Sequence, residues 1–207
     1  MAYKPILFNT EMVKAILDGL KTQTRRIVKP QPVKYGGLWE LGGAGWSSDN
    51  GTIQPVYGHS LWNLQPAKPG DILWVRETWS TTDKCGLFPA WPSTGTHYMH
   101  KGGWMDHEAV KEARWFPSIH MPKEAARIFL RVKDVFMERL NNMTEEDAIA
   151  EGFPDSPAGT DSPLERFSVL WDKTMKRDER SLYGWYANPW VWVIEFERCE
   201  EPEGWCE

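Results

Sequence analysis

The segment Gly19–Arg26 gathers the side chains of this chain that are best suited to chemistry. It reads Gly-Leu-Lys-Thr-Gln-Thr-Arg-Arg, with Lys21 and Thr24 three residues apart. An ammonium and a hydroxyl at this spacing, just beyond the end of a helix, can point into one pocket. The two neighbouring arginines favour loss of the lysine proton, because nearby like charges lower the pKa of an ammonium. The segment therefore suits a base or an activator of a nucleophile.

Two other interpretations of this segment remain open from the residues alone. The cations Lys21, Arg25 and Arg26 can together bind a phosphate group, because charge-assisted hydrogen bonds to phosphate are strong. They can equally be solvated surface charges that follow a helix. The first interpretation favours a nucleotide ligand, whereas the second carries no function.

Further candidate ligand contacts lie on a strand predicted at residues 72–79. Trp79 is the best candidate for a ring that stacks on a base. Arg76 and Glu77 either line the ligand cleft or belong to an ordinary structural ion pair. The candidate substrate-binding residues are thus Arg25, Arg26, Arg76 and Trp79.

A helix over residues 10–18 leads into the segment Gly19–Arg26. Its apolar residues recur at helical spacing, and Asn9 or Thr10 can cap its first turn. Gly19 stands where a residue in the left-handed conformation commonly ends a helix. The side chains that follow therefore leave the helix at a defined point.

The remaining pattern is that of a mixed structure with few helices. Alternating apolar residues predict strands at 72–79, 126–135 and 190–197. Capping boxes predict helices at 144–151 and from 162 to about 175. Strands that lie far apart in the sequence, together with long loops, predict a compact α+β barrel.

Two long segments, 35–66 and 80–123, lack a sustained period. The first is rich in tryptophan and other aromatic residues, which must pack somewhere, so we expect an ordered excursion rather than a linker. The second contains a possible short helix near residues 106–114. The acidic tail after Arg198 is expected to fray.

The charges are unevenly distributed along the chain. The protein has 207 residues and a formal net charge of −5, yet residues 1–34 carry an excess of Lys and Arg, and residues 141–165 carry only acidic charges. A local basic strip on an acidic protein fits one phosphate or one nucleotide better than a long nucleic acid. Two solvated faces of opposite sign are an equally open interpretation.

Composition argues against several classes of protein. No run of 18 apolar residues exists, so no membrane partner is expected. The N-terminus lacks the apolar stretch of a signal peptide, so the expected location is cytoplasmic. Three cysteines without a CxxC pair argue against a disulfide framework and a four-thiolate zinc site. Because His97, His100 and His107 match no zinc spacing, we expect neither a metal nor a cofactor.

The segment Gly19–Arg26 resembles the G-x-K-T-x-T-x-R motif that opens ASCH domains of the PUA-like superfamily. Three later segments resemble, in the same order, the family's turn and strand, its short acidic helix and its closing strand. These segments are Pro69–Leu73, Thr144–Gly152 and Trp192–Phe196. The chain as a whole is also similar to a tryptophan-rich ASCH-like group that is common in phage and prophage genomes.

The resemblance implies a fold and a set of catalytic residues. The implied fold is an α+β, PUA-like small β-barrel with flanking helices and long inserted loops, formed by a single domain over residues 1–207. The insertions fall at about 35–66, 80–123 and 153–186. In related N4-acetylcytidine amidohydrolases, a lysine, a threonine and a glutamate carry the chemistry. The matching residues here are Lys21, Thr24 and Glu151.

Two functions follow from these expectations. The first is an amidohydrolase that acts on an N4-acylated cytosine nucleoside or a related modified nucleobase. In it, Thr24 or a water attacks, Lys21 is a base or a cationic stabiliser, and Glu151 holds the lysine or orients a water. The alternative is a non-catalytic module of the PUA-like type that binds RNA or a modified nucleotide. The expected partner is a nucleoside or nucleotide, free or within RNA.

Overall fold

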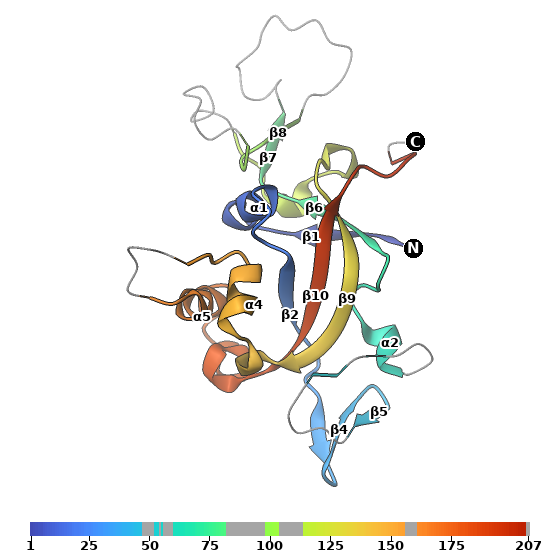
Figure 1. The fold of residues 1–207 in the computed structure, drawn as a ribbon, viewed down its shortest axis with the longest axis vertical. Helices are drawn as coiled ribbons and strands as arrows, with labels where there is room; N and C mark the ends of the chain where they lie inside the picture. The colour runs from blue at the N-terminus through green and yellow to red at the C-terminus, as the bar shows by residue number, and fades with distance from the viewer. Residues whose placement is uncertain are drawn as a thin grey trace, which may run out of the picture. The chain divides into compact units, whose positions relative to one another are not determined.

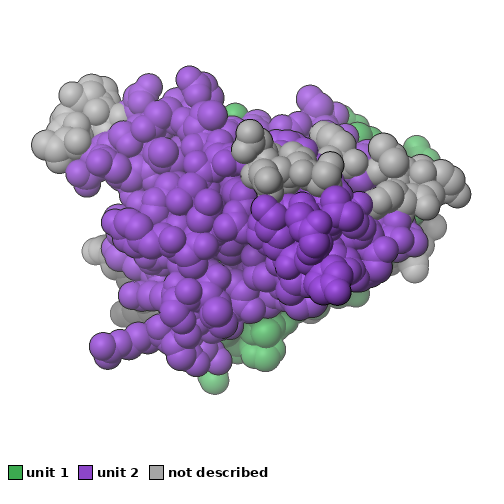
Figure 2. All heavy atoms as spheres, turned by 90° about the horizontal axis from the view of Figure 1, so that it is seen from below, with its two compact units in different colours: residues 1–19, 72–131, 198–207 green, residues 20–71, 132–197 purple. Residues whose placement is uncertain are grey.

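The protein is an α+β structure with several sheets and few helices (Figure 1). The computed structural model describes residues 1–46, 52–53, 55, 60–81, 98–103, 114–155 and 161–205. The chain divides into two compact units, each made of separate stretches (Figure 2). Unit 1 comprises residues 1–19, 72–131 and 198–207, and unit 2 comprises residues 20–71 and 132–197. The single domain with insertions stays a prediction.

The largest sheet has the strand order β1-β6-β9-β10-β2. Strand β1 (Tyr3–Leu7) is parallel to β6 (Ile72–Arg76), which is antiparallel to the start of β9 (Phe129–Arg139). Strand β10 (Trp190–Cys199) is antiparallel to β2 (Gln23–Ile27), and β9 and β10 are long neighbouring strands (Figure 1). Among the described residues, β1 and β2 each have one neighbour in this order. The sheet is therefore open there, and the PUA-like barrel stays a prediction.

Helix α1 (Thr10–Leu17) confirms the helix predicted at residues 10–18. The side chain of Asn9 caps it by accepting a hydrogen bond from the backbone N–H of Met12 at 2.8 Å. Gly19 follows with a φ of 74°, a conformation that favours glycine.

Among the described residues, no helix has the length and apolar character needed to cross a membrane.

The remainder of unit 1 consists of a small sheet, two turns of 3₁₀ helix and an aromatic cluster. The short elements are β7 (Trp79–Thr81), β8 (Tyr98–His100), η2 (Ser118–His120) and η3 (Lys123–Ala125). The ring of Trp205 packs against those of Tyr3, Trp74 and Phe129, with centroids 5.4, 5.9 and 5.0 Å away. Trp205 is only 3% exposed, so the expectation that the tail frays is wrong at this residue. Its aromatic surface outweighs the acidic charges around it.

Two helices cover one face of β10 in unit 2. Helices α4 (Glu145–Ala150) and α5 (Pro163–Lys173) both begin with the predicted capping box. Their apolar residues pack on alternate residues of the strand. The buried contacts are made by Ala148, Phe167, Trp171, Val191 and Val193. The short elements nearby in sequence are η4 (Leu140–Asn142), α6 (Arg180–Tyr183) and η5 (Trp185–Ala187).

A three-stranded antiparallel sheet contacts the first residue of β10, Trp190. Its strands are β3 (Val33–Tyr35), β4 (Leu38–Leu41) and β5 (Ala44–Trp46). The rings of Trp39 and Trp46 meet Trp190 edge to face, with centroids 5.5 and 5.6 Å away. These tryptophans hold the excursion against the strand, as the sequence predicted. Helix α2 (Ser60–Leu64) follows later in the same segment.

The strand predictions agree with the structure in position but less well at their ends. The strand predicted at 72–79 ends at Arg76 as β6. The strand predicted at 126–135 begins at Phe129 and continues to Arg139 as β9, whereas 190–197 corresponds to β10. The short helix expected near 106–114 falls almost wholly outside the described residues, as do His97 and His107.

Candidate functional site

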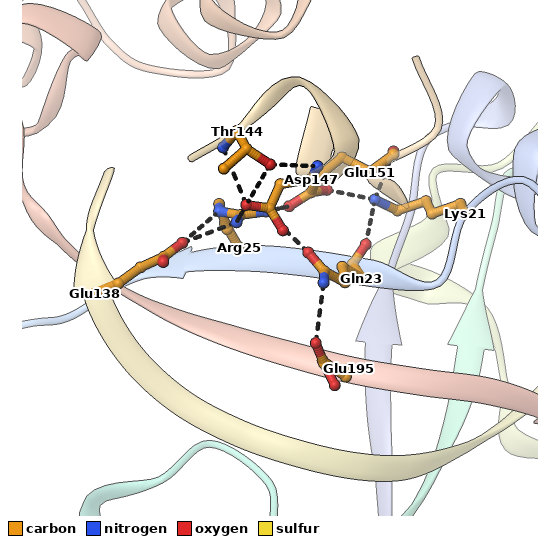
Figure 3. A network of polar contacts seen from close by, with 8 residues as sticks. All are labelled: Lys21, Gln23, Arg25, Glu138, Thr144, Asp147, Glu151 and Glu195. Atoms are coloured by element: carbon orange, nitrogen blue, oxygen red, sulfur yellow. Dashed lines mark hydrogen bonds and ion pairs between the residues drawn. The ribbon is translucent and has the colours of Figure 1, made fainter. Parts of the chain in front are cut away.

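The ammonium of Lys21 lies against the C-terminal end of α4 (Figure 3). Its Nζ donates to Oε2 of Glu151 at 2.5 Å and to the main-chain oxygen of the same residue at 2.8 Å. It also donates to the main-chain oxygen of Gln23 at 2.8 Å. These three acceptors match the three hydrogens of a protonated lysine. The structure thus brings together two of the three residues to which the resemblance assigned catalysis.

Main-chain hydrogen bonds position this pair. The N–H of Thr22 donates to the carbonyl of Ala150 at 2.8 Å, and the N–H of Phe196 donates to the carbonyl of Thr22 at 2.9 Å. Thr22 therefore joins the end of α4 to β10 directly beside Lys21. Gly152, with a φ of 100°, ends the helix immediately after Glu151.

The Lys21–Glu151 pair is closed off from solvent. The exposed fraction of the side chain is 0% for Lys21 and 2% for Glu151. Burial lowers the pKa of Lys21, because desolvation disfavours the charged form, and the negative charge of Glu151 opposes this shift. The positive charges of Arg26 and Arg25 lower the pKa of Lys21 further, as the sequence predicted. The interpretation as solvated surface charges is wrong for Lys21 and Arg25, which are both buried.

Arg25 is surrounded by the buried carboxylates of Glu138 and Glu151 and the partly exposed carboxylate of Asp147 (Figure 3). Its Nε and Nη2 both donate to Oε1 of Glu138, at 3.0 and 2.8 Å. The same Nη2 lies 3.4 Å from Oδ2 of Asp147, and Nη1 lies 3.5 Å from Oε1 of Glu151. Burial raises the pKa of Glu138, and the charge of Arg25 opposes that shift. The guanidinium predicted to bind substrate is thus surrounded by carboxylates of the protein itself.

Gln23 extends this network to β10. Its amide nitrogen donates to Oε1 of Glu195 at 3.0 Å, and its amide oxygen accepts from Nη1 of Arg25 at 3.3 Å. The side chains of Gln23 and Arg25 lie on one face of β2 because alternate residues of a strand share a face. Sequence reasoning missed four members of the network, namely Gln23, Glu138, Asp147 and Glu195. The alternation of β2 could have identified Gln23, and the capping box could have placed Asp147.

Thr24 and Arg26 alternate with these residues along β2. Thr24 is buried opposite Ile194 of β10, and Arg26 is half-buried opposite Trp192. The hydrogen bonds that join Lys21 to Glu151 do not involve Thr24. Burial lowers the pKa of Arg26, and the charge of Glu151 opposes the shift. Arg26 is therefore within electrostatic range of the buried pair.

The other two predicted ligand residues belong to unit 1. Arg76 donates to the carbonyl of Ile119, and its guanidinium lies 5.5 Å from the ring centroid of Trp74. Trp79 packs between aromatic neighbours, with the ring centroids of Tyr98 and Phe116 at 5.8 and 5.2 Å.

The residue next to Arg76 resolves one alternative. Glu77 is buried and forms a two-pronged ion pair with Arg127, at 2.9 and 3.0 Å. The structural ion pair is thus the correct interpretation of Glu77.

In the part of the chain that the structure describes, no three His, Cys, Asp or Glu residues are placed to hold a metal ion.

Comparison of the chain with protein-family models, with curated proteins and with solved structures yields no match. The relation to ASCH domains therefore stays a prediction, carried by the motif Gly19–Arg26 and by the order of the later segments. The chemical argument rests on the geometry of the buried site in unit 2. At its centre is the pair Lys21–Glu151.

Proposed function

We propose that this protein is an amidohydrolase that removes an acyl group from the N4 nitrogen of a cytosine nucleoside or a related modified nucleobase. The observation that carries the proposal is the buried contact of 2.5 Å between Lys21 and Glu151. A lysine and a glutamate without access to solvent are rare unless their contact serves structure or chemistry, because desolvation of both charges is costly. Here it also occurs in the two segments for which the resemblance implies catalysis.

The proposed reaction adds water across the amide bond. A hydroxyl oxygen, from Thr24 or from water, bonds to the acyl carbon while its proton passes to the carboxylate of Glu151. The carbonyl oxygen becomes an oxyanion, which the ammonium of Lys21 stabilises. The carbon–nitrogen bond then breaks, and the cytosine nitrogen takes the proton to leave as an amine. If Thr24 attacks, a water releases its acyl ester in a second step.

The hydrogen bonds of Lys21 support the cationic role over the role of a free base. Three acceptors surround Nζ, so the protonated form satisfies all of them. The role of proton acceptor then falls to Glu151. Because both side chains are enclosed, the substrate reaches them only after a local movement of the surrounding chain. We propose Arg26, whose charge interacts with Glu151, as the residue that neutralises the oxyanion or a phosphate.

The proposal includes the finer expectations drawn from the resemblance. These are a PUA-like ASCH fold with inserted segments, a nucleoside or nucleotide ligand and a cytoplasmic location. For Arg25, the surrounding carboxylates support a role inside the protein rather than contact with the ligand. Arg76 and Trp79, which belong to unit 1, stay the candidate ligand contacts that the sequence predicted.

The proposal is tested with a panel of N4-acylated cytidines, free and within RNA or DNA, followed by mass spectrometry. Conversion to cytidine by the wild type and loss of conversion in the folded double variant Lys21→Met, Glu151→Leu, which leaves no unpaired buried charge, support it. Lys29→Met is the matched control, because Lys29 and Glu179 form an exposed pair at 3.1 Å in the same unit. Binding of nucleotides without any turnover would instead identify the non-catalytic PUA-like module.

A further inference from the structure

The carboxylate of Glu151 is shared between two cations. Its Oε2 accepts from Lys21 at 2.5 Å, and its Oε1 lies 3.5 Å from Nη1 of Arg25 (Figure 3). The two cations therefore compete for one carboxylate. The position of the guanidinium therefore determines how strongly the carboxylate of Glu151 stabilises the ammonium of Lys21.

A second carboxylate, that of Glu138, binds the guanidinium more closely than Glu151 does. Glu138 accepts from both Nε and Nη2 of Arg25, at 3.0 and 2.8 Å, which are shorter than the 3.5 Å contact to Glu151. The side chain of Arg25 is 1% exposed and that of Glu138 is 7% exposed. Water screens charges weakly in such an environment, so the position of Arg25 strongly affects the charge at its neighbours.

The same guanidinium also ties down the helix that carries Glu151. Asp147 of α4 and Glu151, the C-cap residue of that helix, are four residues apart and so lie on one side of it. Arg25 contacts both, and Oδ2 of Asp147 also accepts from the N–H of Thr144 at 3.0 Å in the capping box. One side chain from β2 thus bridges the first turn and the last turn of α4.

We infer that Arg25 is the positioning residue of this site: anchored by Glu138, it orients Glu151 so that one carboxylate oxygen is held for Lys21. The inference rests on the proposed function for its catalytic meaning. Its geometric content, a relay from Glu138 through Arg25 and Glu151 to Lys21, is independent of the substrate. Lysine cannot replace Arg25 in this relay, because a single ammonium cannot reach Glu138 and both carboxylates of α4 as a planar fork does.

The relay predicts pKa changes of opposite sign at Lys21. In Glu138→Gln, Arg25 loses its anchor and moves toward Glu151, so the pKa of Lys21 falls below that of the wild type. In Arg25→Lys, the competitor for Glu151 is displaced, so the pKa of Lys21 rises. A merely structural role predicts no change, or a rise in both variants as loosened packing admits water.

The pKa of Lys21 is measured by NMR titration of the protein with isotopically labelled lysine, which requires no turnover. Arg139→Lys is the matched control, because Arg139 is in unit 2 and packs over Trp39 and Trp190, at 5.6 and 5.5 Å. If Arg25→Lys does not fold, the double change Arg25→Met with Glu138→Leu removes both buried charges and is likewise expected to raise the pKa. Shifts in the same direction in Glu138→Gln and in the Arg25 variant, or no shifts, overturn the inference.

Kinetics separate this inference from the proposed function. On any acylated cytidine that the wild type hydrolyses, Glu138→Gln is expected to lower kcat by about tenfold to a hundredfold with little change in KM, because it misplaces a catalytic group. Unchanged kcat in Glu138→Gln overturns the positioning role. Absence of turnover in the wild type overturns the proposed hydrolase only, while the opposed pKa shifts still decide the relay.

Discussion

Nζ of Lys21 and Oε2 of Glu151 lie 2.5 Å apart, although 130 positions separate the two residues in the sequence. The contact depends on β2 and α4 being held together by the hydrogen bond from the N–H of Thr22 to the carbonyl of Ala150. Neither charge reaches solvent, so Lys21 depends on Glu151 for compensation, and Glu151 depends on Lys21 and Arg25. This mutual dependence sets the expected behaviour of the variants.

Glu151→Gln is expected to destabilise the protein strongly. The change leaves the ammonium of Lys21 buried without its partner charge, which typically costs about 3–5 kcal/mol. Urea unfolding measures the loss directly. Glu179→Gln removes the carboxylate of the exposed pair with Lys29, and its effect is expected to stay within about 0.5 kcal/mol. Equal effects of the two changes would contradict the burial of the pair.

Replacement of both partners is expected to restore much of this stability. The double change Lys21→Met with Glu151→Leu leaves neither charge buried, and such replacements are often neutral or stabilising. The expected free energy of unfolding is therefore closer to that of the wild type than to that of Glu151→Gln. A double variant less stable than Glu151→Gln alone would show that the pair is not the dominant interaction here. Urea unfolding of the wild type, the single variant and the double variant provides the comparison.

The fold of this site could be predicted from sequence only where the signals are local. The cap of α1 at Asn9, the end of the helix at Gly19 and the capping box at Thr144 all act within a few residues, and each is confirmed. Strand β2 was missed, because its polar residues Gln23–Arg26 resemble a loop until β10 pairs with them. Pairing between distant strands leaves no short-range pattern in a sequence.

The residues of the site, like the elements of the fold, could be predicted only where a short stretch of sequence carries a recognisable pattern. The resemblance to ASCH domains pointed to Lys21, Thr24 and Glu151, but no pattern links Glu138 in β9 to Arg25 in β2. Their contact arises only when the strands and α4 assemble. The sequence also left open whether Lys21 and Arg25 are solvated, a question that tertiary burial decides.

His100 makes stability depend on pH in the acidic range. Burial lowers its pKa below the ordinary value of about 6.5, although the charge of Glu77 and the hydrogen bond from Nε2 to the carbonyl of Ala125 at 2.7 Å oppose the shift. The unfolded chain therefore binds a proton at a higher pH than the folded chain. Stability is fully present above about pH 6.5 and falls as the pH drops toward the lowered pKa.

Urea unfolding of the wild type and of His100→Gln at pH 7.5 and pH 5.5 tests this expectation. The wild type is expected to lose more stability than the variant between the two conditions, because glutamine takes up no proton. The same pH dependence in both proteins would assign the effect to other groups. Arg127, which lowers the pKa of His100 further, stays in place in both proteins.

Trp205→Ala is expected to destabilise unit 1 by about 3–5 kcal/mol, as is usual for removal of a buried large aromatic side chain. The ring contacts Tyr3, Trp74 and Phe129, and the ammonium of Lys123 lies 4.2 Å from its centroid. Thermal unfolding followed by near-ultraviolet circular dichroism reports the loss. Tyr186→Ala is the control, because Tyr186 is 94% exposed. A similar melting temperature for both variants would contradict the packing of the C-terminal tail.

The measurement that tests the central claim most directly is the rate of cytidine release from N4-acetylcytidine by the wild type and by the Lys21→Met, Glu151→Leu double variant. The double variant is the appropriate comparison because it removes the chemistry while leaving no unpaired buried charge. The account predicts release by the wild type and a rate at least about a hundredfold lower in the folded double variant. Equal rates in the two proteins would contradict it, as would the absence of release by the wild type from every acylated cytidine in the panel.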